Sequence, residues 1–175
     1  MGIDLMLGYG ITECSPIVSV NASLNGRRAA DETVGWTFPS EEVKIYQPDY
    51  TGIGEALVSG ENVMMGYYND PYSTADVFTD GWFRTGDLGH LNKDGSLTIT
   101  GRKKNLIILS NGENVSPEEI EYQLARIPEI KEVVVYTEGN LIVAEIFPEE
   151  NEMTDADLKA VLQERINDYN AHQPS

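Results

Sequence analysis

The sequence predicts an α+β protein in which a β-rich first part is followed by a smaller mixed part. Short apolar runs bounded by glycine dominate residues 1–100, and two Asp-Gly pairs there lie between apolar segments. After Gly101 the pattern changes, because residues 116–127 and the segment from Thr154 onward carry apolar side chains at helical spacing. We therefore expect a domain boundary near Gly101.

The first part contains the patterns of strands and tight hairpins. Residues 41–47 (EEVKIYQ) alternate apolar Val43 and Ile45 with polar neighbours, and residues 54–60 (GEALVSG) form a short run between glycines. The Asp-Gly pairs in FTDGWF and LNKDGSLTIT predict hairpins, since glycine tolerates a positive φ. One helical turn is expected over residues 71–78.

The second part alternates strand and helix patterns. Residues 105–109 (NLIIL) resemble a buried strand, and residues 131–147 predict two strands joined at 138–140. Ser116, Pro117 and Glu119 fit a helix start with a capping box. A last helix is expected from near Thr154, with an apolar stripe made of Leu158, Val161, Leu162 and Ile166.

Composition restricts the partners. The chain of 175 residues has a formal net charge of −17, which argues against nucleic acid or an anionic membrane surface because both would repel it. No apolar run reaches the length of a membrane span. A single cysteine excludes an internal disulfide and fits a reducing compartment, so we expect a cytoplasmic location.

The segment LGYGITECSP (residues 7–16) combines groups that suit a nucleotide. Glycines let the backbone approach a ligand closely, and the ring of Tyr9 offers a flat face for a base. Thr12 offers a hydroxyl to a phosphate, and Glu13 offers a hard oxygen ligand for Mg²⁺. Taken alone, the segment favours a simple turn with a half-buried tyrosine.

Three further segments have both a functional and a structural interpretation. Residues 54–74 are a strand and a hydrophobic bend that suit a scaffold. In GWFRTGDLG (81–89), Asp87 suits a ribose diol, although an aspartate in a turn looks similar. Three adjacent cations at residues 102–104 either protect a hairpin edge or lie near an anionic ligand.

These four segments, in this order, resemble the adenylate-forming (AMP-binding) superfamily, which includes acyl-CoA synthetases, adenylation domains of peptide synthetases and luciferases. GYGITECSPIVSVN and GRKKNLIILSNGENVSPEEIE look most like bacterial long-chain fatty-acid–CoA ligases. The resemblance implies activation of a carboxylate with Mg-ATP to an acyl-adenylate, followed by transfer of the acyl group to coenzyme A. The implied partners are small molecules: ATP, a fatty acid and CoA.

The resemblance also assigns roles to individual residues. Tyr9 would stack on adenine, Asp87 would bind the ribose with help from Arg102, and Lys104 would be the hinge between the two half-reactions. Thr12 and Glu13 would be the catalytic pair, with Glu13 holding the metal. The nucleotide-binding set implied is Tyr9, Gly10, Thr12, Asp87 and Arg102, and the loop expected on the CoA side contains Ser110, Asn111 and Gly112.

The resemblance implies two domains. Residues 1–100 would be the barrel-like end of the large adenylation domain, and residues 101–175 a small mobile domain with a three-stranded sheet and helices. The phosphate loop and the final lysine segment of the family have no counterpart here, so we expect a C-terminal fragment that is inactive alone, binds ATP weakly and self-associates through exposed surface. Alternatives are a fragment of another adenylating enzyme, such as a peptide-synthetase adenylation domain or an acyl–acyl-carrier-protein ligase, and a non-catalytic interaction module.

Overall fold

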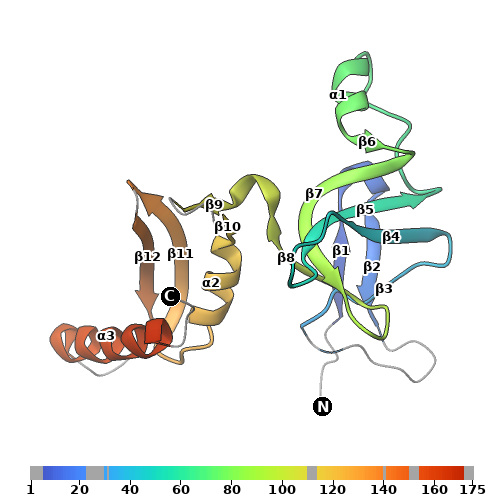
Figure 1. Ribbon diagram of the computed structural model, residues 1–175. Helices are drawn as coiled ribbons and strands as arrows, with labels where there is room; N and C mark the ends of the chain where they lie inside the picture. The colour runs from blue at the N-terminus through green and yellow to red at the C-terminus, as the bar shows by residue number, and fades with distance from the viewer. Residues whose placement is uncertain are drawn as a thin grey trace. The chain divides into compact units, whose positions relative to one another are not determined.

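The computed structural model describes residues 6–22, 30, 32–109, 114–139, 141–149 and 154–171. The chain divides into two compact units, Met1–Leu106 and Ile107–Ser175. Figure 1 shows the β-rich first unit and the mixed second unit, and each is described by itself below. The α+β class predicted from the sequence is confirmed.

The first unit contains two antiparallel sheets. One has the order β1 (Leu7–Gly10), β2 (Ile17–Asn21) and β3 (Trp36–Thr37). The other has five strands, in which β5 lies between β4 and β7, and β7 also pairs with β6 and β8. Their bounds are β4 (Glu41–Tyr46), β5 (Gly54–Gly60), β6 (Phe78–Thr79), β7 (Trp82–Leu91) and β8 (Leu97–Arg102). These strands form open sheets, so the barrel-like part is not a closed barrel.

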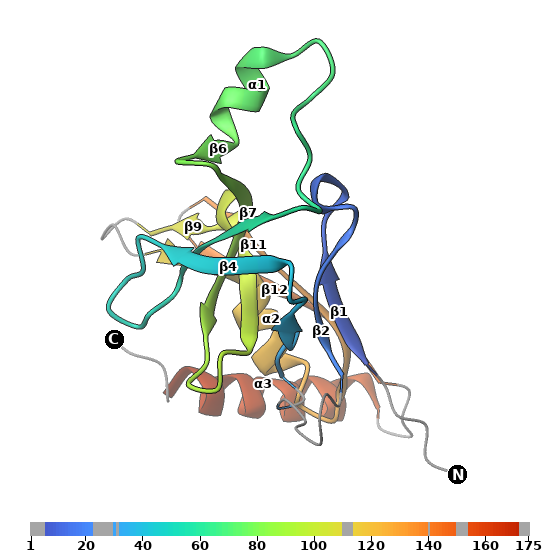
Figure 2. The ribbon, with the colours of Figure 1, turned by 90° about the vertical axis from the view of Figure 1, so that its right-hand side faces the viewer.

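The core of the first unit joins the two sheets. Val18 of β2 and Cys14 pack with Val58 of β5 and Phe83 of β7, and all four side chains are buried. Half-buried apolar residues such as Val43 cover this cluster. The strands that carry the predicted site residues therefore rest on one shared core, while the short helix α1 (Pro71–Asp76) stands away from the sheets in both views (Figure 1 and Figure 2).

The turn chemistry read from the sequence is confirmed. Asp80 and Gly81 both have positive φ, at 51° and 80°, and connect β6 to β7 in the tight geometry that an Asp-Gly pair favours. Gly95 has a φ of 83° in the turn between β7 and β8. The predicted strands at residues 41–47 and 54–60 correspond to β4 and β5.

The second unit combines two-stranded sheets with two helices. β11 (Ile130–Glu138) and β12 (Leu141–Pro148) form an antiparallel hairpin, and α2 (Pro117–Leu124) packs against β11. A hydrogen bond of 2.7 Å from the Val135 backbone N–H to Glu121 Oε1 ties the helix to the strand. The last helix, α3 (Asp155–Ala171), begins where predicted, because the Thr154 hydroxyl accepts the Asp157 N–H at 3.3 Å as a cap.

Two details of the second unit differ from the sequence predictions. The three-stranded sheet is not formed among the described residues, since β9 (Ile107–Ile108) is only two residues long and pairs with β10 (Asn114–Val115) instead. The predicted capping box at α2 is also wrong. Ser116 precedes the helix without a side-chain cap, and its hydroxyl donates to Glu118 at 3.0 Å. In the described ranges, no helix is long and apolar enough to cross a membrane.

Candidate functional site

The loop after β1 is shaped by a close backbone contact that requires glycine. The Ile11 N–H donates to the Pro16 carbonyl at 2.7 Å, which closes the loop around the short 3-10 turn Thr12–Cys14. A Cβ on Gly10 would lie 2.1 Å from that same Pro16 oxygen. The Met64 N–H then donates to the Glu13 carbonyl at 2.7 Å. Thr12 and Glu13 are thus held in a fixed loop.

Asp87 is the centre of a buried polar cluster. Its side chain is 4% exposed, and it accepts the Tyr9 hydroxyl at 2.5 Å on Oδ2 and pairs with Arg102 Nε at 2.8 Å on Oδ1. Burial raises the pKa of Asp87 although the Tyr9 hydrogen bond and the Arg102 charge oppose it. Burial and the bond to Asp87 also raise the pKa of Tyr9, so its hydroxyl remains a donor.

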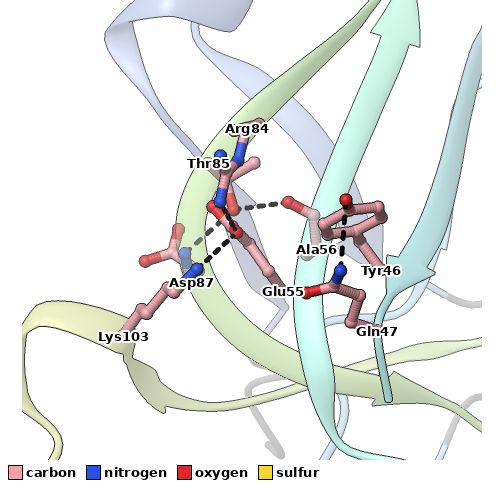
Figure 3. Close-up of polar contacts among 8 residues, drawn as sticks. All are labelled: Tyr46, Gln47, Glu55, Ala56, Arg84, Thr85, Asp87 and Lys103. Atoms are coloured by element: carbon pink, nitrogen blue, oxygen red, sulfur yellow. Dashed lines mark hydrogen bonds and ion pairs between the residues drawn. The ribbon is translucent and has the colours of Figure 1, made fainter. Parts of the chain in front are cut away.

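A bulge in β7 positions Asp87 within this cluster. Glu55 of β5 faces Leu88, but Leu57 faces Arg84, so β7 has extra residues between these two pairs. Gly86 in the bulge has a φ of 73°. The Thr85 hydroxyl donates to the Ala56 carbonyl at 2.8 Å and accepts the Asp87 N–H at 3.0 Å, which fixes the bulge (Figure 3).

The buried Glu55 is the centre of a second polar cluster, which was not predicted from the sequence. Its Oε2 accepts Arg84 Nη2 at 2.7 Å and Lys103 Nζ at 3.1 Å, and Figure 3 shows the two cations converging on it. Burial raises the pKa of Glu55, but the hydrogen bonds and charges of Arg84 and Lys103 outweigh this effect and lower it overall. Only the position of Glu55 in a glycine-bounded strand hinted at its burial.

A pocket of about 760 Å³ in the first unit is lined by Arg102 of the first cluster and by Glu55, Arg84 and Lys103 of the second. The Glu13 carboxylate at its wall accepts the Tyr67 hydroxyl at 2.9 Å, and this bond raises the pKa of Tyr67. The lining brings together residues from the first loop, β5, β7, the end of β8 and the turn that follows β8. The polar or charged members used below are Thr12, Glu13, Glu55, Tyr67, Arg84, Arg102, Lys103 and Lys104.

The predicted site residues fall into three groups. Gly10, Thr12, Glu13, Arg102 and Lys104 line the pocket. Tyr9 and Asp87 are not among the lining residues and are bonded to each other, so both groups expected to contact a nucleoside have protein partners here. The loop residues Ser110, Asn111 and Gly112 lie outside the described residues.

The donor set at the pocket fits a magnesium ion bound mainly through a substrate. Mg²⁺ prefers oxygen ligands and is commonly held by one or two carboxylates plus phosphate oxygens. Glu13 provides one carboxylate in the lining. Among the residues that the structure describes, no group of three acidic, histidine or cysteine side chains is arranged as a metal site. Glu13, whose lining neighbours include Glu55 and Asp76, would hold the ion together with the phosphates.

Comparison with known proteins identifies the family. The model of the AMP-binding enzyme matches residues 1–68, and the model of the AMP-binding enzyme C-terminal domain matches residues 104–175. The chain belongs to the AMP-binding, adenylate-forming enzymes. This class contains ligases that use ATP and CoA as substrates.

Individual relatives extend this result. The chain is 39% identical to an indoleacetate–CoA ligase of Aromatoleum aromaticum, over 96% of this chain and 35% of the relative. It is 41% identical to a long-chain-fatty-acid–CoA ligase of Salmonella typhimurium, over 69% of this chain and 22% of the relative. The structure of O-succinylbenzoate coenzyme A synthetase of Bacillus subtilis in complex with AMP superimposes with a TM-score of 0.72 at 28% identity, over 91% of this chain and 34% of that one. The chain thus spans about a third or less of these relatives.

Proposed function

We propose that this chain belongs to an ATP-dependent acid–thiol ligase whose acid substrate is a long-chain fatty acid. The observation that carries the proposal is the pocket itself. Thr12 and Glu13 of the first loop line it together with Arg102, at the end of β8, and Lys104, in the turn that follows. The identity to CoA ligases supports the reaction class, and the Salmonella typhimurium relative supports the fatty acid. The cytoplasmic location predicted from the single cysteine belongs to the same proposal.

The two half-reactions assign work to the pocket residues. A carboxylate oxygen attacks the α-phosphorus of ATP and pyrophosphate leaves, after which the CoA thiolate attacks the acyl carbon and AMP leaves. The Thr12 hydroxyl donates a hydrogen bond to a phosphate oxygen. The Arg102 and Lys104 cations stabilise the negative charge that accumulates in the transition state. Mg²⁺, held by Glu13 and the phosphates, would supply further charge neutralisation when bound.

Nucleoside binding requires Asp87 to exchange one hydrogen-bond partner. Asp87 accepts the Tyr9 hydroxyl in this structure, and a ribose diol would have to replace that donor. The released Tyr9 ring would then be free to stack on adenine, as predicted. Lys104 would be the hinge about which the chain rotates between the two half-reactions. The loop that contains Ser110, Asn111 and Gly112 would approach the pantetheine arm of CoA.

Titration of the ¹⁵N-labelled chain with AMP and with Mg-ATP tests the nucleotide site. We expect weak binding that shifts the amide signals of Gly10, Thr12 and Glu13, and a Thr12→Val variant should weaken it further. Thr37→Val, on β3 and outside the pocket lining, is the matched control. Unchanged pocket signals at saturating nucleotide would contradict the proposed site.

An assay of acyl-CoA formation tests the acid and the acceptor. The protein that contains this chain should convert long-chain fatty acids with ATP and CoA, and release AMP and pyrophosphate. Indoleacetate serves as the competing acid, because one relative is an indoleacetate–CoA ligase. Preference for indoleacetate would retain the ligase class and overturn the fatty acid, whereas transfer only to a carrier protein would overturn the CoA acceptor.

A further inference from the structure

The carboxylate of Glu55 is shared between two cations from different elements. Glu55 on β5 is 5% exposed, and its Oε2 alone accepts both Arg84 of β7 and Lys103 (Figure 3). The pair with Arg84 links neighbouring strands of one sheet. The pair with Lys103 is different, because it connects that sheet to the 3-10 turn Lys103–Asn105 that follows β8.

Lys103 is the residue directly before Lys104, the proposed pivot. The turn that contains both has a weak backbone closure, since the Leu106 N–H reaches the Lys103 carbonyl only at 3.4 Å. None of the three residues of the turn is buried. The ion pair from Lys103 Nζ to the buried Glu55 is therefore a specific tie between this turn and the sheet of the first unit.

We propose that Glu55 is a positioning residue that clamps Lys103 to β5, so that chain movement begins at Lys104 and not before it. The inference rests on the proposed function, in which Lys104 is the pivot of the ligase. Without the clamp, the movable stretch would extend back to Arg102, whose guanidinium pairs with Asp87 at the nucleotide site. Glu55 would thus isolate that site from movement of the hinge.

The geometry favours a clamp of moderate strength. The Lys103 side chain is 51% exposed, so its pair with Glu55 is partly screened by solvent. Glu55 itself is buried and remains compensated by Arg84 when Lys103 is removed. Loss of Lys103 should therefore release the turn without leaving an isolated buried charge.

Limited trypsin digestion measures release of the Lys103–Asn105 turn from the sheet, because trypsin cleaves after lysine and acts faster on a released segment. The quantity is the rate of cleavage between Lys104 and Asn105, identified by mass and divided by the rate in a synthetic peptide of the same sequence. Glu55→Gln and Lys103→Met should each raise this ratio by about threefold, which corresponds to a tie of about 0.6 kcal/mol. Lys103→Arg should restore slow cleavage, since it keeps a cation.

Controls separate the clamp from general destabilisation. Cleavage after Lys131, on β11 in the other unit, should be unchanged in every variant. Glu42→Gln removes an exposed carboxylate from β4 and should leave cleavage after Lys104 at the wild-type rate. In the double variant Glu55→Gln/Lys103→Met, the effects should not multiply, because both substitutions remove the same contact.

Two outcomes would overturn the proposal. One is an unchanged ratio at Lys104 in Glu55→Gln and Lys103→Met. The other is an effect of Glu55→Gln that Lys103→Met fails to reproduce, which would make Glu55 a support for Arg84 and the sheet only. No nucleotide enters this measurement, so absence of AMP binding would count against the proposed function and leave the clamp result standing.

Discussion

At the scale of single residues, Asp87 and Tyr9 show how one hydrogen bond links stability to the proposed site. The Tyr9 hydroxyl is held by Asp87 Oδ2, and Arg102 occupies the other oxygen. A ligand that needs Asp87 must therefore compete with Tyr9. Removing the hydroxyl while keeping the ring separates the two roles assigned to this tyrosine.

Tyr9→Phe should destabilise the chain and leave AMP binding intact or strengthened. We expect a loss of about 1 to 2 kcal/mol in the free energy of unfolding by urea, because a buried carboxylate loses a donor. Binding should persist, since the ring remains and Asp87 is free for ribose. Tyr46→Phe, which removes a hydroxyl bonded to Gln47 near the surface, is the control. Weaker AMP binding in Tyr9→Phe than in wild type would contradict the assignment.

Glu41 is a buried carboxylate whose Oε2 has no hydrogen-bond partner among the described residues. Burial raises its pKa. The pKa of the buried Cys14 thiol is raised to about 12 by burial and by the charges of Glu41 and Glu13. That thiol is a core group, and burial disfavours the charged form of the Glu41 carboxylate.

Glu41→Gln should stabilise the chain at pH 7 by about 1 kcal/mol. Because the pKa of Glu41 is raised in the folded state, its contribution to the free energy of unfolding is fully present below the unfolded-state pKa. That contribution is lost as pH rises through the folded-state pKa. The advantage of the variant should therefore shrink as pH falls from 7 toward 4.5 in urea titrations. Glu42→Gln, at an exposed position, should show no such trend, and a pH-independent difference for Glu41→Gln would refute the explanation.

At the scale of elements, the loop that carries Thr12 and Glu13 depends on Gly10. Gly10→Ala should destabilise the chain by at least about 2 kcal/mol, because the new Cβ would meet the Pro16 backbone oxygen at 2.1 Å. Gly8→Ala in the same strand is the control, since its Cβ would have an ordinary contact at 3.9 Å from the Ser19 oxygen. Equal urea midpoints for the two variants would show that the loop relaxes freely.

The sequence predicted those elements whose signal is local. Apolar alternation and the Asp-Gly pair were sufficient for β4, for β5 and for the turn into β7. The prediction of a three-stranded sheet was wrong because the partner of a two-residue strand depends on which strand lies next to it. No local sequence pattern encodes that neighbour. The bulge in β7 and the contact between Glu55 and Lys103 were not predicted for the same reason, since both join segments that are distant in sequence.

At the scale of the whole molecule, net charge and exposed apolar surface have opposite effects on self-association. The net charge of −17 makes copies of the chain repel. Large side chains near α1 are nevertheless exposed to solvent, namely Met65, Tyr68 and Tyr72. Repulsion between copies depends on ionic strength, because the screening length falls from about 30 Å at 0.01 M salt to about 8 Å at 0.15 M.

Self-association should therefore increase with salt. Sedimentation equilibrium should give a mass near the 19.4 kDa of one chain at 0.01 M salt and a larger average mass at 0.5 M, where repulsion is screened and apolar contact remains. The double variant Tyr68→Ser/Tyr72→Ser should reduce the increase, whereas Tyr50→Ser, at an equally exposed tyrosine in the turn between β4 and β5, should not. A single-chain mass at every salt concentration would mean that the surface near α1 does not bind a second copy, and that the expected self-association is wrong.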